Sequence, residues 1–293
     1  MQLFTTSEAA AYLRLKERKI YEMVAEGAVP CTKVTGRWLF PKSELDRWLA
    51  ESITRPAGMA RPEPPPIVAG SHDPLLEWAL RESGSGLATL AVGSEAGFAR
   101  FADNEAIADA IHLHAMDDPA ADANVAALRA RNDMHDAVMI GFCRREQGFV
   151  VASGNPRKIA RIEDVMKKRA RVALRPKGAG AQLLLLSLLH GAGARLNDLT
   201  GGPVCPTGSD IGQAIRAGRA DVGIATRSVA NAAGLDFVPI TWEAFDLVLR
   251  QRDYFRPPLQ ALAAFLRSRE LAARAREMGG YDVAQAGNVR FVV

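Results

Sequence analysis

Three serines directly follow a glycine and stand just before a stretch whose residue pattern predicts a helix: Ser71, Ser94 and Ser209. The N-terminus of a helix presents unpaired N–H groups and the positive end of the helix dipole, so hydroxyl groups and small residues there favour an oxyanion. We therefore predict these serines as anion donors, with Arg175 as the balancing charge. The competing interpretation, that each serine only caps a helix, stays open at this point.

Other titratable residues offer weaker chemistry. His72 and Asp73 are adjacent and suggest a general base, but no nucleophile is placed near them by spacing. Asp221 either reaches the ligand or pairs with Arg175, and we favour the pairing. The sequence therefore gives no nucleophile–base pattern, and an enzyme is the least favoured class of protein.

A metal site is also disfavoured. His112 and His114 alternate along a short predicted strand, with two aspartates following, but a satisfied or exposed histidine pair is the better interpretation. The three cysteines, Cys31, Cys143 and Cys205, have neither CxxC nor Cys/His spacing. A zinc site and a disulfide framework are both unexpected, and we predict neither metal nor cofactor.

The first fifty residues must form a small unit of their own. We expect helices at residues 5–13, 17–26 and 43–49, and two short strands within 33–42 around Gly36. Thr6 or Ser7 can cap the first helix, and Glu8 suits its first turn. This order closely resembles the winged helix-turn-helix of the excisionase and MerR-like family.

The resemblance implies that the second helix enters the major groove of DNA and that the strand hairpin forms a wing. The residues then expected to contact bases or phosphates are polar residues of the second helix and of the wing: Lys16, Arg18, Lys19, Lys33, Thr35 and Arg37. Taken singly, each of these residues is also compatible with an ordinary solvated surface position. The pattern as a whole predicts double-stranded DNA as a partner.

Composition sets the broad class. A chain of 293 residues with 48% hydrophobic and 24% charged residues is typical of a globular protein with two domains. The formal net charge of +4 is small, so DNA contact has to come from local patches. No signal peptide is visible, and the apolar run 183–189 is too short to cross a bilayer. We expect a cytoplasmic protein.

The domain plan follows from the change of composition after residue 52. Residues 1–52 form the DNA-binding unit, 53–66 form a proline-rich linker, and 67–293 form the second domain. The alternative for 53–66 is a structured strap on the surface of one domain. From residue 67 the chain alternates strands and helices, which predicts an α/β fold with parallel sheets covered by helices. We expect strands at 67–74, 87–94, 111–114, 137–142, 148–152, 171–175, 220–225, 237–240 and 245–249, and helices at 75–80, 106–111, 182–190, 209–217 and 258–267.

A second resemblance covers nearly all of 67–293. The segments that carry it are Gly70–Leu76, Gly93-Ser94, Ala220–Ala225 and Tyr254–Leu259. They resemble the type II periplasmic-binding-protein-like domain, the class that includes molybdate receptors and LysR effector domains. Relatives usually carry a Gly-Ser-Gly loop after the strand that ends at Arg175, whereas this chain has Gly178-Ala179-Gly180 and lacks the hydroxyl.

The resemblance implies two lobes. The chain would pass from one lobe to the other near Gly148 and return near Thr241. Lobe 1 is then 67–147 with 241–293, and lobe 2 is 148–240. Loops from both lobes would meet at the ends of the strands and bind a small ligand. The residues predicted for that site are Ser71, His72, Asp73, Ser94, Arg175, Gly178, Gly180, Ser209 and Asp221.

Together the two resemblances predict a one-component transcriptional regulator that binds DNA, as a homodimer, and senses a small anion. Molybdate or tungstate is the first ligand hypothesis, and a small organic anion is the second. An architectural, excisionase-like DNA-binding protein is a third possibility, and an enzyme on the same fold is the last.

Overall fold

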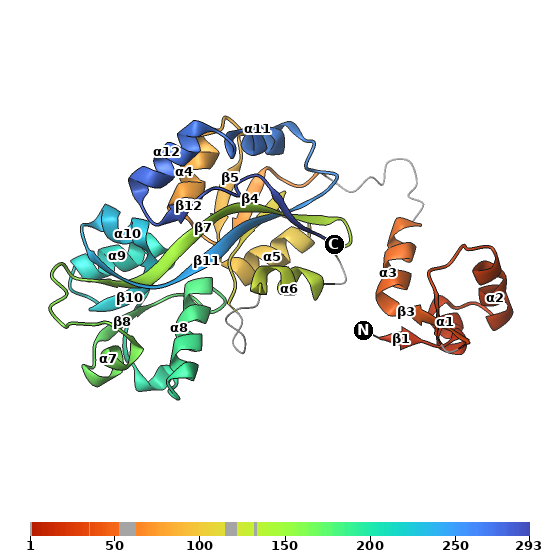
Figure 1. The fold of residues 1–293 in the computed structure, drawn as a ribbon, viewed down its shortest axis with the longest axis horizontal. Coiled ribbons are helices and arrows are strands. Elements are labelled where there is room, and N and C mark those ends of the chain that lie inside the picture. The colour runs from red at the N-terminus through yellow and green to blue at the C-terminus, as the bar shows by residue number, and fades with distance from the viewer. Residues whose placement is uncertain (1, 35, 53–62, 115–121, 132–133) are drawn as a thin grey trace. The chain divides into compact units, whose positions relative to one another are not determined.

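The computed structural model describes residues 2–34, 36–52, 63–114, 122–131 and 134–293. The chain divides into two compact units (Figure 1). One comprises Met1–Pro62 with Arg131–His135, and the other comprises Glu63–Ala130 with Asp136–Val293. The predicted linker residues 53–62 lie outside the described part. Glu63, at the end of that linker, forms an ion pair with Arg256 at 2.8 Å, within the second unit.

The amino-terminal unit has the predicted order of elements. A first strand that the sequence analysis did not anticipate joins the hairpin in a three-stranded antiparallel sheet, ordered β1-β3-β2. Its elements are β1 (Leu3–Phe4), α1 (Thr6–Leu13), α2 (Glu17–Ala25), β2 (Thr32–Val34), β3 (Arg37–Pro41) and α3 (Lys42–Glu51).

Local signals explain where α1 begins. Thr5, rather than Thr6 or Ser7, is the N-cap, because Thr5 has extended backbone and its side chain accepts the N–H of Glu8. The Glu8 carboxylate accepts the Thr5 N–H in return, which completes a capping box. The core of this unit then forms from small residues on α1 and large ones opposite: Ala9, Ala10, Ile20, Val29, Phe40 and Leu45.

The second unit is built on one ten-stranded mixed sheet, ordered β5-β4-β6-β11-β7-β10-β8-β9, with β12 and β13 paired to β7. Two parallel groups flank the antiparallel pair β11 and β7. The strands are β4 (Ile67–Gly70), β5 (Ala88–Ala91), β6 (Ala108–Ile111), β7 (Ala137–Val151), β8 (Arg171–Leu174), β9 (Thr200–Val204), β10 (Val222–Thr226), β11 (Asp236–Arg250), β12 (Tyr281–Asp282) and β13 (Val289–Val292).

Helices cover the sheet as predicted for this class. In Figure 1, α4, α11 and α12 lie together beside β4 and β5, whereas α7, α8, α9 and α10 surround β8 and β10. Their bounds are α4 (Pro74–Glu82), α5 (Ser94–Ala102), α6 (Ala123–Arg129), α7 (Ile162–Lys167), α8 (Gly180–Gly191), α9 (Gly208–Arg216), α10 (Arg227–Ala233), α11 (Pro257–Phe265) and α12 (Arg269–Met278).

The strands β7 and β11 correct the sequence analysis, which predicted two short strands in place of each. Each is a single strand of 15 residues, and the two run antiparallel side by side (Figure 1). The charged residues that broke the apolar pattern pair with each other: Glu243 lies opposite Arg145 in the register. Burial of these charges is tolerated because they neutralise each other.

The hydrophobic core of this unit consists of separate clusters. One cluster draws its residues from 68–143 and 245–286, and two others draw theirs from 149–240. β7 and β11 pass through both regions. We keep the names lobe 1 and lobe 2 for the segments defined above.

The segment 106–111 was assigned wrongly. It was predicted as a helix from its alanines, but residues 108–111 form β6, whose four residues are all buried. Alanine favours a helix only weakly, and burial between β4 and β11 overrides that preference. The helix of this region, α5, lies earlier and was not predicted.

Candidate functional site

A small, partly open pocket of about 20 Å³ lies where strands of both lobes end. Lobe 1 contributes the turn after β4, the residue after β6, and the middle of β7. Lobe 2 contributes the loop after β8 and the starts of α8, α9 and α10. The residues that line it are His72, Pro74, His112, Arg145, Gln147, Arg175, Ala181, Gly208, Ala225, Thr226 and Val229. Ligands of open α/β sheets bind at such strand ends.

A network of buried charges forms the floor of the pocket. Arg145 Nε donates to Glu243 Oε1 at 2.6 Å, and Arg145 Nη1 donates to Asp73 Oδ2 at 2.8 Å. Gln147 Nε2 donates to the same Glu243 oxygen at 2.9 Å, and His114 Nε2 lies 2.7 Å from Glu243 Oε2. Burial alone would raise the pKa of Glu243, but the charge of Arg145 and the hydrogen bond with His114 oppose burial, and that pKa lies well below its usual range. Glu243 is therefore ionised.

His112 is the most informative residue of the pocket. Its side chain is almost fully buried, and neither ring nitrogen has a hydrogen-bond partner among the described residues. Burial, and then the charge of Arg145, lower the pKa of its imidazole well below the usual range, so the ring is neutral at pH 7. A neutral imidazole offers one donor and one acceptor. Nε2 faces Gly180 and lies 3.7 Å from Glu243 Oε1, beyond hydrogen-bond distance.

The predicted serines Ser71 and Ser94 position His112. Ser94 Oγ donates to the His112 carbonyl at 3.1 Å and accepts the His112 N–H at 3.2 Å. Because the single hydrogen of Ser94 is used there, Ser71 must donate to Ser94 across their 2.9 Å contact. Both serines are buried, and both hydroxyl hydrogens are already donated. Neither serine is an N-cap, so the capping interpretation is wrong for both.

The predicted glycines lie beside the pocket. A Cβ on Gly180 would lie 2.1 Å from His112 Nε2, so only glycine at the start of α8 lets the imidazole pack there. Gly178 has φ +80 and packs against Glu95. The N-cap of α8, Ala179, supplies no side-chain hydrogen bond. The first N–H groups of α8 are therefore not capped by a side chain.

The pair of His72 and Asp73 does not form. Adjacent residues in extended backbone point to opposite sides, and Asp73 is extended. Asp73 caps α4 by accepting the N–H groups of Leu75 and Leu76, while the His72 ring lies 3.2 Å from Glu77. Only His72 lines the pocket, and Asp73 supports it through Arg145.

Arg175 lines the pocket from lobe 2. Its Nη2 donates to the Pro206 carbonyl at 2.8 Å, and its Nε is buried without a partner in the described part of the chain. Burial lowers the pKa of the guanidinium to about 10, so it stays protonated at neutral pH. Among the described residues, no carboxylate lies within ion-pair distance of Arg175. It is a partly buried positive charge whose Nε–H is buried without a partner among the described residues.

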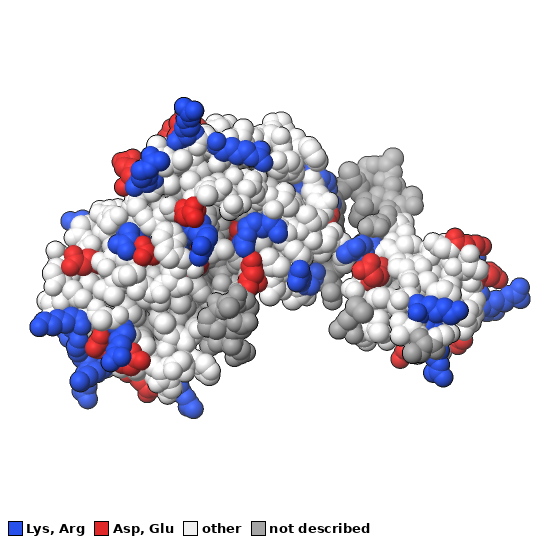
Figure 2. All heavy atoms as spheres, in the orientation of Figure 1, with Lys and Arg blue, Asp and Glu red and all other residues white. Residues whose placement is uncertain are grey.

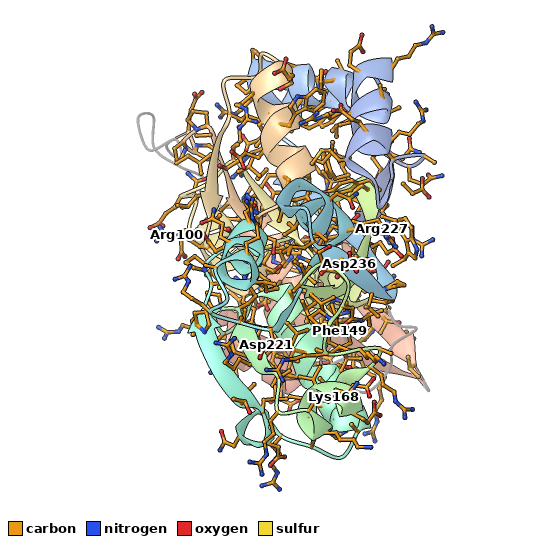
Figure 3. All side chains as sticks on the ribbon, turned by 90° about the vertical axis from the view of Figure 1, so that its left-hand side faces the viewer. Arg100, Phe149, Lys168, Asp221, Arg227 and Asp236 are labelled. Carbon is orange, nitrogen blue, oxygen red and sulfur yellow. The ribbon has the colours of Figure 1, made fainter. Side chains whose placement is uncertain are left out.

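Two predicted residues lie elsewhere. Asp221 pairs with Arg171 at 2.9 Å and Arg157 at 3.2 Å, not with Arg175, so that prediction was wrong. Asp221, labelled in Figure 3, precedes β10 and is therefore at the end of the strand away from the pocket residue Thr226. Ser209 is exposed in the first turn of α9, whose N-cap is Thr207.

Sequence analysis did not place five residues at this pocket or in the charge network beneath it: His112, Arg145, Gln147, Thr226 and Glu243. A signal existed for three of them. Arg145 and Gln147 belong to a polar stretch, 144–147, between two apolar runs, and Glu243 stands between Trp242 and Ala244; polar residues buried in such places need partners. Their partners come from distant parts of the chain, so the sequence alone did not pair them.

The predicted DNA-contacting residues lie on the surface of the amino-terminal unit, where basic and acidic side chains are interspersed (Figure 2). Lys16 is the N-cap of α2, and the Arg18 side chain is 91% exposed, 3.3 Å from Glu22. Lys33 lies over the Trp38 ring at 5.1 Å, and Arg37 is exposed at the start of β3. Lys19 also contacts Glu22, at 3.4 Å. Thr35 lies outside the described residues.

Tyr21 on α2 is a further correction. Its helical spacing from Ile20 and Val24 led us to expect it on the apolar face that packs against α1, but 51% of it is exposed. Ile20 occupies the buried position instead. Tyr21 is thus an additional exposed aromatic group on the helix that carries Arg18 and Lys19.

No described helix is both long and apolar enough to cross a membrane. Within the described residues there is also no cluster of three or more His, Cys, Asp or Glu side chains arranged to hold a metal ion.

Comparison with known proteins gives relatives for both parts of the chain. An uncharacterised protein of Bacillus subtilis (strain 168), YvgK, is 21% identical over 98% of this chain and 97% of its own length. A protein encoded beside a ferredoxin gene in Clostridium pasteurianum is 24% identical over 27% of this chain and 71% of its own length. A phosphate-bound putative transporter substrate-binding protein from Clostridium perfringens superposes with a TM-score of 0.51 at 11% identity, over 72% of this chain and 96% of that one.

Family models match both predicted domains. A helix-turn-helix domain matches residues 3–52, and a PBP superfamily domain matches residues 77–267. The second match covers more than half of the chain and agrees with the two-lobed α/β fold described above. The chain belongs to the PBP superfamily and carries a helix-turn-helix domain before its PBP-like domain.

Proposed function

We propose that this protein is a one-component transcriptional regulator that binds DNA through its helix-turn-helix domain and a small anion through its PBP-like domain. One observation carries the ligand part of the proposal. Arg175 is a partly buried cation with an unpartnered, buried Nε–H and without a carboxylate partner among the described residues, and it lines a pocket with His112 and Gln147. A partly buried charge and a buried donor of this kind are stabilised when a group of opposite charge joins them. An anion in the pocket supplies that charge.

The arrangement of the pocket suggests how binding is coupled to regulation. His72 and His112 belong to lobe 1, and Arg175 and Thr226 belong to lobe 2. A ligand that contacts both sets stabilises the closed arrangement more than an open one, which is the requirement for a switch. We further propose that the regulator acts as a homodimer, since one short recognition helix reads few base pairs.

The chemistry of the ligand starts from an anion. The resemblance to molybdate receptors suggests molybdate or tungstate, and a small organic anion is the alternative. If the protein had a purely architectural role, we would expect the polar groups of the cleft to be hydrogen-bonded by the protein's own side chains. The unpartnered atoms of His112, Gln147 and Arg175 argue against that. The same pocket lacks a recognisable nucleophile–base pair, so we favour binding over catalysis.

Replacing Arg175 by glutamine is expected to abolish stabilisation by the anion. A ligand that binds only the native state adds about 2.7 kcal/mol at 100 times its dissociation constant, and the variant should lose most of that shift. The measurement is thermal unfolding of the full chain with a panel of inorganic oxyanions and small organic acids. Lys177→Gln is the matched control, because Lys177 is exposed two residues away. A full shift in the Arg175→Gln variant would remove Arg175 from the site.

Replacing Arg18 or Arg37 by alanine is expected to weaken DNA binding and leave anion binding unchanged. If each arginine contacts a phosphate, each variant should reduce the slope of log affinity against log salt by about 1. The measurement is fluorescence anisotropy with a duplex selected from random sequence, at several salt concentrations. Arg216→Ala, which removes an exposed charge from the PBP-like domain, is the control. Simultaneous loss of DNA and anion binding in a folded variant would contradict the division of labour between the domains.

A further inference from the structure

The orientation of the Gln147 amide is fixed by its neighbour. Nε2 is 2.9 Å from Glu243 Oε1, which already accepts a hydrogen bond from Arg145 Nε. A carboxylate only accepts, so the amide must present its NH₂ group to Glu243. Turning the amide over would place two acceptor oxygens against each other. Gln147 Oε1 is therefore free of Glu243, buried, and without a partner in the described part of the chain. This oxygen can accept a hydrogen bond from a bound molecule.

Thr226 is a second acceptor by the same reasoning. Tyr281 donates its only hydroxyl hydrogen to Asp73 Oδ2 at 3.1 Å. Ser228 must then donate to Tyr281 across their 2.9 Å contact, and Thr226 must donate to Ser228 across theirs of 2.8 Å. Thr226 Oγ1 has no hydrogen left for the pocket that it lines. Only its lone pairs remain.

The pocket also contains donors. Arg175 Nε–H is buried without a partner among the described residues, and neutral His112 supplies one N–H together with one acceptor nitrogen. The pocket thus combines one positive charge and at least two donors with three acceptors. A buried acceptor left without a donor is unfavourable, so the bound molecule has to satisfy both sets.

These hydrogen-bond assignments point to the class of ligand. We infer that this pocket selects a small anion that carries its own hydrogen-bond donor, such as monohydrogen phosphate, over tetrahedral anions that only accept, such as sulfate, molybdate and tungstate. The inference rests on the proposed anion-binding function and narrows it. The oxygens of such an anion accept from Arg175 and His112, and its O–H group donates to Gln147 Oε1 or Thr226 Oγ1. The small volume of the pocket favours a ligand of few atoms.

Phosphate and sulfate form the decisive pair, since they match in size and shape and differ in the proton. We expect the full-length protein to bind inorganic phosphate at neutral pH about tenfold to a hundredfold more tightly than sulfate or molybdate, because an unsatisfied buried acceptor weakens binding by this factor. Isothermal titration calorimetry measures the dissociation constants. Glycolate and acetate form a second pair, in which the donor is a hydroxyl group on a carboxylic acid.

Variants of the two acceptors test the reason for the selectivity. Gln147→Met and Thr226→Val each remove an acceptor and should bring the phosphate-to-sulfate ratio closer to one. Thr226→Ser restores the hydroxyl and should recover the ratio, which separates hydrogen bonding from a change of packing. Lys177→Gln should keep the wild-type ratio.

Each result has a distinct meaning. Preference for phosphate over sulfate, or for glycolate over acetate, supports the inference, and the preferred pair identifies an inorganic or an organic ligand. Equal or tighter binding of sulfate or molybdate overturns the inference and leaves the anion-binding function standing. Failure of all these anions to bind, in a protein that is folded by circular dichroism, overturns both.

Discussion

Replacing Arg145 by methionine is expected to destabilise the PBP-like domain by about 3–5 kcal/mol, the usual result of breaking a buried ion pair by removing one partner. Arg145 is among the most deeply buried side chains of the described residues, and it contacts both Asp73 and Glu243. Methionine fills similar space, so packing is largely kept. The loss comes from two carboxylates that remain buried without their cation. Urea unfolding of the full chain, followed by far-ultraviolet circular dichroism, gives the free energy of unfolding.

The double variant Arg145→Met with Glu243→Gln provides the control. If the destabilisation comes from an uncompensated charge, neutralising Glu243 should recover part of the stability lost in Arg145→Met. The effects of residues in contact are then not additive, with a coupling of about 0.5–3 kcal/mol. Additive effects, or a single variant as stable as the parent, would show that the ion network contributes little to the fold. Its role would then be to hold Gln147 and the strand crossing in place.

Much of the fold could be predicted because its signals are local. The capping of α1, the glycine between β2 and β3, and the apolar runs of β4, β8 and β10 each depend on a few neighbouring residues. These were enough for the amino-terminal helices and hairpin and for the α/β class of the second domain. Long strands such as β7 were divided because Arg145 interrupts the apolar run, and its partner Asp73 lies 72 residues away in the sequence. No local pattern shows that such a charge will be neutralised.

The place of the candidate site in the fold was easier to predict than the hydrogen-bond partners of its residues. The turn after β4 and the loop after β8 both reach one pocket, which His72 and Arg175 line, whereas Ser94 after β5 bonds the His112 backbone instead. The roles of Ser71 and Ser94 were not visible, because whether a serine hydroxyl is free depends on a carbonyl from another strand, here that of His112. Asp221 was assigned to the wrong arginine because Arg171 and Arg175 occupy opposite ends of one strand segment. Hydrogen-bond partners, unlike strands, are set by tertiary structure.

Asp109 leads to the second prediction of large effect. It lies in the middle of β6, fully buried, with neither carboxyl oxygen hydrogen-bonded to another side chain among the described residues. Gly97 of α5 makes room for it, since a Cβ there would lie 2.3 Å from Asp109 Oδ1. Burial raises the pKa of this carboxyl well above its usual range, so the folded protein keeps Asp109 protonated where the unfolded chain releases the proton.

The sign of the pH dependence follows from this raised pKa. Below about pH 3.9, both states are protonated and Asp109 has no effect on the pH dependence. As the pH rises above that value, only the unfolded state loses the proton, and stability falls by about 1.4 kcal/mol per pH unit until the folded pKa is reached. Asparagine has nearly the same shape and does not titrate. Asp109→Asn is therefore expected to become progressively more stable than the parent between pH 4 and neutral pH.

Urea unfolding of both proteins from pH 4 to pH 8 measures this difference directly. Asp103→Asn is the matched control, because Asp103 is exposed at the end of α5 and should show no comparable trend. A difference between Asp109→Asn and the parent that stays constant with pH would mean that Asp109 does not hold its proton in the folded state. In that case the carboxylate must be compensated by a positive charge or solvent that reaches β6. A difference that grows with pH instead establishes a neutral acid under α5, beside the Ser71–Ser94 contact that fixes His112.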